Sequence, residues 1–143
     1  MDIKGIVNRL CKQHDARDPF EIAKTMGISI VFEQLGTIRG YYQHAYRQKI
    51  IHINCDIDER QQFFTCAHEL GHSILHPNLN TPFLRERTFF SVNKLEIQAN
   101  RFATELLYPD ESFKEFLCFT IPQIAQCLNL SESLVEYKIK SLQ

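Results

Sequence analysis

Two histidines four residues apart constrain this chain more than any other feature. His68 and His72 stand in the segment FFTCAHELGH, residues 63–72, inside a run of helical spacing that Pro77 would end. Residues at this spacing project from one face of a helix. The two imidazoles can therefore hold one metal ion, and zinc takes imidazole nitrogen at about 2.0 to 2.1 Å.

Glu69 directly follows the first histidine, so it lies about 100° around the helix from His68. Its carboxylate is then beside the face that carries the histidines and not on it. A carboxylate in that place can take a proton from water at the metal without replacing the water. We therefore expect Glu69 to be the general base of a hydrolytic site.

The alternative interpretation is a surface helix whose histidines are solvated. With six histidines in 143 residues, chance alone would give about 0.02 matches to the pattern His-Glu-x-x-His. An apolar stripe also runs along roughly the opposite side of the helix, formed by Phe63, Ala67, Leu70 and Ile74. The pattern favours a helix that packs its back on the core and presents the histidines to a cleft.

Glu96 is our candidate for a third metal ligand. It falls in the middle of the apolar face of a second expected helix, over residues 92–107, which Pro109 would close. Burying an unpaired carboxylate costs several kcal/mol, so Glu96 needs a cation or strong donors there. The alternative is a capping box, because Asn93 and Glu96 have the spacing of a helix start. We favour the ligand.

His76 follows His72 by four residues and could be mistaken for another ligand. It is eight residues from His68, about 12 Å along a helix axis, which is too far for the two to share one ion. We expect His76 to lie behind the ligands or at the helix C-terminus, where a cation suits the helix dipole. Asn78 excludes the longer pattern that ends in a third histidine.

The rest of the chain predicts an α+β fold in a single domain, residues 1–143. No repeat or linker divides it. We expect two N-terminal helices within 1–27, a short antiparallel sheet within 28–55, the two helices with the site residues within 56–109, and a helical C-terminal part within 110–143. Asp56 or Asp58 would cap the motif helix, and the sheet would pack against it.

Composition narrows the class of protein further. Hydrophobic residues make up 44% and charged residues 23%, as in ordinary globular domains. No apolar run approaches the roughly 20 residues of a membrane span, and no signal-peptide pattern opens the chain, so we expect a cytoplasmic protein. A net charge of -1 offers no excess for phosphates, so direct binding to nucleic acid is not expected.

The five cysteines contain no Cys-x-x-Cys pair. This argues against a disulfide framework and against a zinc site made of thiolates. We expect most of these cysteines to be small buried hydrophobic residues.

Two segments resemble a known family. Residues 65–72 (TCAHELGH) and 95–109 (LEIQANRFATELLYP) are similar to the ImmA/IrrE family of metallopeptidases, which is often found beside phage-type or mobile-element repressors. The resemblance extends upstream through residues 50–54 (IIHIN) and covers roughly Asp18 to Pro109. The last thirty residues match less firmly.

The resemblance implies a small zincin-like metallopeptidase domain with one Zn²⁺ per chain. Carried over by position, it assigns His68, His72 and Glu96 to zinc and Glu69 to catalysis, in agreement with the spacing. It also implies a protein substrate, usually a helix-turn-helix transcriptional repressor that is cleaved to relieve repression. Two imidazoles and one carboxylate favour zinc, although such a site accepts other divalent ions.

Substrate and transition-state contacts are less constrained by the sequence. An extended peptide could lie against a sheet edge formed by the strand with Gly40, Tyr41 and Tyr42, although these tyrosines read more simply as ordinary sheet residues. Tyr41, His44 and His52 are all candidates to stabilise an oxyanion, and the sequence does not separate them.

Two other classes of function stay open. The first is a regulatory binding protein that sequesters a repressor or senses a signal without proteolysis. The second is DNA binding through residues 121–140, whose spacing is similar to a helix-turn-helix. In that segment Glu132 and Glu136 cancel Lys138 and Lys140, so we favour a helical pair that completes the core or docks a partner.

Overall fold

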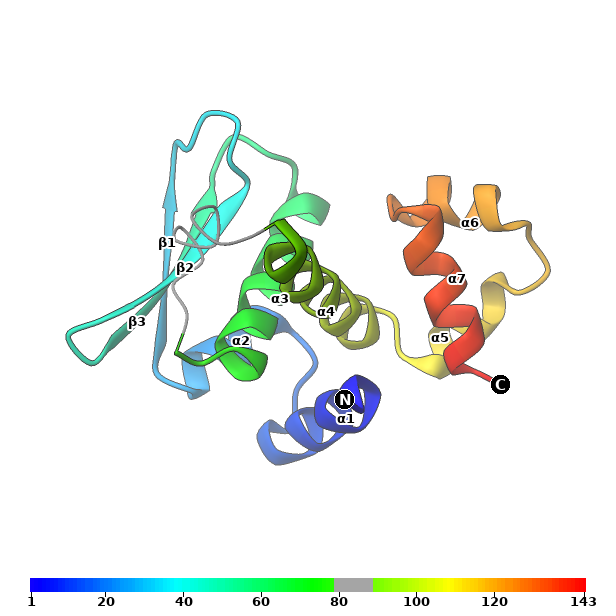
Figure 1. Ribbon diagram of the computed structural model, residues 1–143, viewed down its shortest axis with the longest axis horizontal. Helices are drawn as coiled ribbons and strands as arrows, with labels where there is room; N and C mark the ends of the chain where they lie inside the picture. Colours follow the sequence, from blue (N-terminus) through cyan, green and yellow to red (C-terminus); the bar gives the residue numbers. More distant parts are fainter. Residues whose placement is uncertain (79–88) are drawn as a thin grey trace.

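The computed structural model describes residues 1–78 and 89–143 (Figure 1). Its order of helices, strands and helices is the expected one. None of the helices in the described part combines the length and hydrophobicity that a bilayer crossing requires. The elements are α1 (Ile3–His14), α2 (Pro19–Thr25), β1 (Ile28–Glu33), β2 (Gly40–Ala45), β3 (Gln48–Asn54), α3 (Glu59–Leu75), α4 (Phe89–Leu107), α5 (Asp110–Phe113), a 3-10 turn (Lys114–Phe116), α6 (Ile121–Leu128) and α7 (Glu132–Ser141).

Side-chain caps set the helix starts that position the motif. Asp58 is the N-cap of α3, and its carboxylate accepts a hydrogen bond from the backbone N–H of Gln61 at 2.8 Å. His76 is the C-cap, directly before Pro77. Of the two aspartates expected to cap this helix, Asp58 does so. Most of the loop expected between α3 and α4 lies outside the described residues.

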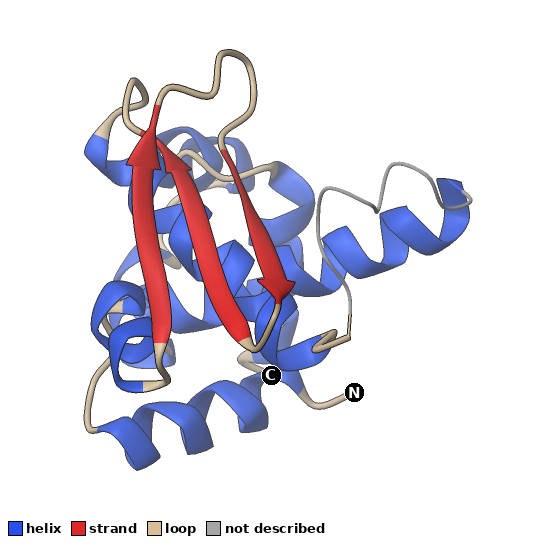
Figure 2. Ribbon diagram, turned by 90° about the vertical axis from the view of Figure 1, so that its left-hand side faces the viewer, coloured by secondary structure: helices blue, strands red, loops and turns tan. Residues whose placement is uncertain are grey.

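The sheet is mixed, with strand order β1-β3-β2. The expected antiparallel pairing is confirmed for β2 and β3, which are joined at Tyr46 and Arg47, both with positive φ, 53° and 66°. It is wrong for β1, which pairs with β3 in parallel. The link from β1 crosses the end of β3, where the Asn54 amide donates to the carbonyls of Gly36 and Ile38 at 3.1 and 3.0 Å. Figure 2 shows two strands pointing one way and one the other.

The helices cover one face of this sheet (Figures 1 and 2). Tyr42, Ile51 and Ile53 are fully buried on that face, in one cluster with Ala67 and Leu70 of α3. Successive residues of a strand point to opposite faces, so the residues between them point away from the helices. The sheet thus forms the back support of the motif helix.

Helices α3 and α4 pack closely against each other. Ala99 and Ala103 are fully buried, as their small size predicts for a close helix approach. Gly71 contributes as well, because a Cβ at this position would lie 2.9 Å from Cδ1 of Phe102. Small residues on both helices therefore bring their polar faces together.

A second hydrophobic cluster lies in the C-terminal part. It contains Phe113, Ile124, Leu128 and Val135, with Phe64 of α3 packed against both clusters. The expected pair of short helices is present as α6 and α7, separated by residues 129–131.

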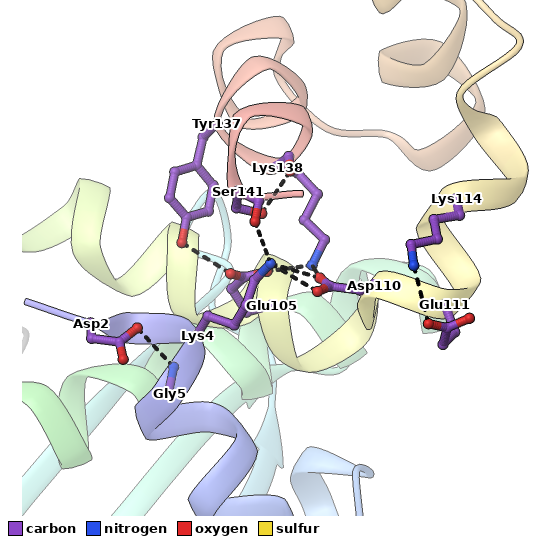
Figure 3. Close-up of polar contacts among 10 residues, drawn as sticks. All are labelled: Asp2, Lys4, Gly5, Glu105, Asp110, Glu111, Lys114, Tyr137, Lys138 and Ser141. Carbon is purple, nitrogen blue, oxygen red and sulfur yellow. Dashed lines mark hydrogen bonds and ion pairs between the residues drawn. The ribbon is translucent and has the colours of Figure 1, made fainter. Parts of the chain in front are cut away.

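A network of ion pairs attaches α7 to the rest of the chain (Figure 3). Lys138 pairs with Glu105 of α4, and both side chains are about 1% exposed. Lys138 also pairs with Asp110 at 2.8 Å, and Lys4 of α1 contacts the same carboxylate at 2.8 Å. Lys4 further donates to the carbonyl of Ser141 at 2.8 Å. Four helices, α1, α4, α5 and α7, therefore meet in one network, with the buried pair of Lys138 and Glu105 at its centre.

The cysteines correct one expectation. All five are free, but Cys55, Cys118 and Cys127 are exposed, while Cys66 is buried. Of the two in the C-terminal part, Cys118 lies in the turn before α6 and Cys127 on the solvent side of α6, which composition alone does not reveal. Burial raises the pKa of the Cys66 thiol, so this cysteine is an inert core residue.

Candidate metal centre

Three side chains from α3 and α4 converge. His68 Nε2 lies 3.1 Å from Oε2 of Glu96, and His72 Nε2 lies 2.7 Å from Oε1 of the same carboxylate. Their ligand-type atoms all lie within 4.8 Å of one another. Two imidazole nitrogens and a carboxylate oxygen are a donor set that fits a divalent transition metal.

The helix boundary removes the capping alternative for Glu96. Helix α4 begins at Phe89, so Asn93 lies inside the helix and is not its N-cap. The Glu96 carboxylate instead faces the two histidines across the α3–α4 interface. The capping-box alternative is therefore wrong.

The electrostatics of the three groups are coupled. Burial by itself raises the pKa of Glu96, but the hydrogen bonds from His68 and His72 outweigh it and hold that pKa well below its usual range. Burial lowers the pKa of His68, but Glu96 and Glu69 outweigh it, and the net pKa is raised. Burial dominates for His72 and lowers its pKa. Glu96 thus supplies an ionised carboxylate to the group.

Each histidine has a second partner on its other ring nitrogen. His68 Nδ1 lies 2.8 Å from Oδ1 of Asn100, and His72 Nδ1 lies 3.0 Å from Nδ1 of His76. The chain continues, because His76 Nε2 lies 2.8 Å from Oε1 of Gln98. These contacts fix both rings with Nε2 toward Glu96, as outer partners of metal-binding histidines do.

His76 therefore lies behind His72, at the end of the helix, as expected. Sequence reasoning missed Asn100 and Gln98. A signal for Asn100 was present, since it follows Glu96 by four residues and shares its helix face. Gln98 had no such signal.

Glu69 borders the same cleft as the group. This cleft has a volume of about 380 Å³ and is lined by His68, Glu69 and Glu96 together with Gly40 and Asn100 among others. Glu69 is 5% exposed, and His72 is 1% exposed behind the cleft. The motif residues and Glu96 are thus brought together, and Glu69 lines the cleft beside the three ligand-type residues.

The structure separates the three oxyanion candidates from the site. His52 stacks on Tyr41 with ring centroids 4.2 Å apart, and it contacts Glu33 at 2.7 Å. Both rings lie on the sheet face opposite the buried Tyr42. His44 lies further along β2 and, like the other two, does not line the cleft. Tyr41 and Tyr42 are ordinary sheet residues, which was the simpler reading of that strand.

Gly40 brings the start of β2 to the cleft. A Cβ at this position would lie 2.5 Å from the His52 carbonyl oxygen and 2.6 Å from Cγ2 of Thr65. Only a glycine fits there. Because β2 is an outer strand of the described sheet, its first residue brings an edge of that sheet beside the metal-ligand group.

A helix with two histidines and a neighbouring glutamate, completed by a carboxylate from a second helix, defines a metallopeptidase type of site. The comparisons agree with this class. The family model described as IrrE N-terminal-like domain, a peptidase family, matches residues 23–140. The chain belongs to that family, and it is a metallopeptidase by family.

Two relatives match nearly the whole chain. An uncharacterized immunity region protein 2 of Bacillus phage phi105 is 40% identical over 95% of this chain and 88% of its own length. Metallopeptidase ImmA of Bacillus subtilis is 36% identical over 98% of this chain and 85% of its own length.

A solved structure of a Mycobacterium tuberculosis transcriptional regulator has the same fold. It matches with a TM-score of 0.59 at 18% identity, over 94% of this chain. The chain spans 44% of that regulator. At this identity the likeness concerns the fold alone.

Proposed function

We propose that this protein is a zinc metalloendopeptidase with one Zn²⁺ per chain, and that its substrate is a helix-turn-helix transcriptional repressor. The observation that carries the proposal is the convergence of His68, His72 and Glu96 at a cleft that His68, Glu69 and Glu96 line. A purely structural zinc site would fill its fourth position with a protein ligand. Among the described residues, no fourth ligand accompanies these three.

In this proposal His68, His72 and Glu96 hold the zinc. The donor set fits, because neutral imidazole and ionised carboxylate are its ordinary ligands, and the pKa of Glu96 is low. When bound, zinc supplies a Lewis acid and positive charge to the reacting carbonyl and water. Asn100 and His76 keep the two rings oriented.

Glu69 is the general base. It accepts a proton from the attacking water and passes this proton to the leaving amine. Glu69 is nearly buried and lines the cleft beside His68, so its carboxylate lies close to the proposed metal ligands. The substrate backbone would lie along the start of β2, an outer strand of the described sheet, whose first residue, Gly40, lines the cleft.

The substrate class rests on the family. The ImmA/IrrE resemblance implies a repressor of the helix-turn-helix type, and one relative is by name a phage immunity region protein. A repressor works on DNA in the cytoplasm, so we place this protein there. We also propose that residues 1–143 act as one domain, since the ion-pair network ties α7 to α1 and α4.

Two rival functions meet specific obstacles. A binding protein without proteolysis would have no use for Glu69 at the cleft. DNA binding through α6 and α7 would need Lys138, which is buried in ion pairs with Glu105 and Asp110 and is closed to phosphate.

The substitution Glu69→Gln tests the proposal. It should retain zinc and lose most hydrolysis of the helix-turn-helix repressor encoded nearest to the protein, by about 100-fold or more. The matched control is Glu59→Gln, on the exposed first turn of the same helix, which should leave the rate unchanged. Full activity of Glu69→Gln would refute the role of the base. If wild type and Glu69→Gln both bind the repressor tightly and neither cleaves it, the binding-protein alternative would be favoured.

A further inference from the structure

A second hollow continues from the metal cleft. It has a volume of about 200 Å³ and shares Arg39, Phe64 and Asn100 with that cleft. Asn100 also bonds the Nδ1 of His68, so the shared wall begins directly beside the proposed metal ligands. A peptide in the metal cleft can therefore extend into this hollow, which we call the side groove.

The far wall of the side groove comes from the C-terminal helices. Leu128, Leu130 and Leu134, around the turn between α6 and α7, line it together with Phe64 and Tyr108. Leu128 and Leu130 are 6% and 8% exposed, so they present a firm apolar surface and not mobile side chains. Apolar side chains of a bound segment would find contacts here.

The charged residues that line the side groove in the described structure are all positive. Arg39 and Arg60 line it, and none of its described lining residues is an Asp or Glu. Within residues 1–78 and 89–143, no carboxylate lies within 4.0 Å of either guanidinium. Arg60 donates to the Cys127 carbonyl at 2.8 Å, whereas Arg39 is exposed at the junction with the metal cleft. Arg39 is thus the cation that a ligand meets first.

The wall is fixed in place by several contacts. Besides the Arg60 bond to Cys127, the Tyr108 hydroxyl donates to the Leu128 carbonyl at 3.4 Å. At the other end of the helix pair, Lys138 is held by Glu105 and Asp110 (Figure 3). A groove whose walls are fixed before binding loses less entropy when a ligand enters.

We propose that the side groove is a substrate subsite that selects an acidic side chain flanked by apolar ones, a few residues from the scissile bond, and that Arg39 is the residue that reads the acid. The proposal rests on the peptidase function proposed above, because it treats the groove as part of the same binding surface. It gives the α6–α7 pair a role in recognising the substrate protein.

Selection from a random library of 12-residue peptides tests the subsite without needing hydrolysis. The bait is zinc-loaded Glu69→Gln protein, and the same selection is run on this protein with Arg39→Glu added. The first pool should be enriched in Asp or Glu beside apolar residues. The second should lose these residues and gain Lys or Arg. The matched control is Arg9→Glu, on the exposed face of α1, which should give the first pool again.

Individual peptides then give the size of the effect. An acidic peptide from the first pool should bind Arg39→Gln about two- to fivefold more weakly than it binds the parent protein, since one exposed charge pair is lost. Three outcomes would overturn the proposed subsite. The selected peptides could lack acidic residues, they could be the same for Arg39→Glu, or no peptide could be recovered.

The two proposals fail in different ways. Acidic selection with no hydrolysis of any repressor would refute the peptidase function and keep the groove as a peptide site. Hydrolysis that is equally fast for Arg39→Glu and shows no acidic preference would refute the subsite alone.

Discussion

The Nδ1 atoms of His72 and His76 lie 3.0 Å apart, one helical turn from each other on α3. Only one hydrogen can lie between them. Gln98 Oε1 accepts a hydrogen bond, so it fixes the proton of His76 on Nε2 and leaves Nδ1 of that ring as an acceptor. His72 is then the donor through Nδ1, and its Nε2 is left to a metal.

We predict that His76→Phe lowers zinc affinity by about 10- to 100-fold, because the ring of His72 loses the partner that orients it. Gln98→Leu should have a smaller effect in the same direction. Competition with a chromophoric chelator measures both. His14→Phe, a change to a histidine of α1 distant from the site, is the control. Equal zinc affinity for His76→Phe and wild type would contradict the chain of hydrogen bonds.

Lys138→Met should destabilise the fold strongly. It leaves the Glu105 carboxylate buried without its cation, which costs about 3 to 5 kcal/mol in comparable sites. Urea unfolding measures the free energy, and Lys140→Met, at an exposed position of the same helix, is the control. Adding Glu105→Leu should recover part of the loss. A Lys138→Met protein as stable as the control would show that the network contributes little.

Asp110 predicts a pH dependence of stability. Burial alone raises its pKa, but hydrogen bonds from Lys138 and Lys4 outweigh burial and lower the pKa below 3.8. A lowered folded-state pKa gives stability that is present above the unfolded-state pKa and is lost as pH falls through the folded-state value. Asp110→Asn should therefore be less stable than wild type above about pH 5. The difference should shrink below about pH 4. Urea unfolding of both proteins, from below about pH 4 to above about pH 5, measures this difference in stability. A difference that does not change with pH would contradict the prediction.

Gly71→Ala should separate α3 from α4. The added Cβ would lie 2.9 Å from Phe102, and the contact costs about 1 to 3 kcal/mol if the helices must shift. Since the site residues are divided between the two helices, zinc affinity should fall as well. Adding Phe102→Leu should restore both stability and zinc affinity. If the double variant is no more stable than Gly71→Ala and binds zinc no more tightly, the contact with Phe102 is not the cause of the loss.

The sequence predicted the site residues because their signals are local. The spacing of His68, Glu69 and His72 depends only on the helical period, and the position of Glu96 in an apolar stripe indicates a charge that needs a partner. The structure brings His68, His72 and Glu96 together, and His68, Glu69 and Glu96 line one cleft. Their chemical roles stay predictions.

Other features depend on tertiary arrangement. The parallel pairing of β1 with β3 arises because the β2–β3 hairpin leaves the other edge of β3 open, and strand patterns alone do not state which edge a third strand joins. Gln98 and the side groove depend on how α4 and the α6–α7 turn pack on α3. No spacing within one element encodes these contacts.

Metal content per chain, measured by elemental analysis of wild type and Glu96→Ala purified side by side, tests the central claim most directly. The account predicts close to one zinc per wild-type chain and much less in the variant, because Glu96 completes the group with His68 and His72. A wild-type protein that holds no metal after loading with zinc, or a variant that holds as much zinc as wild type, would contradict it.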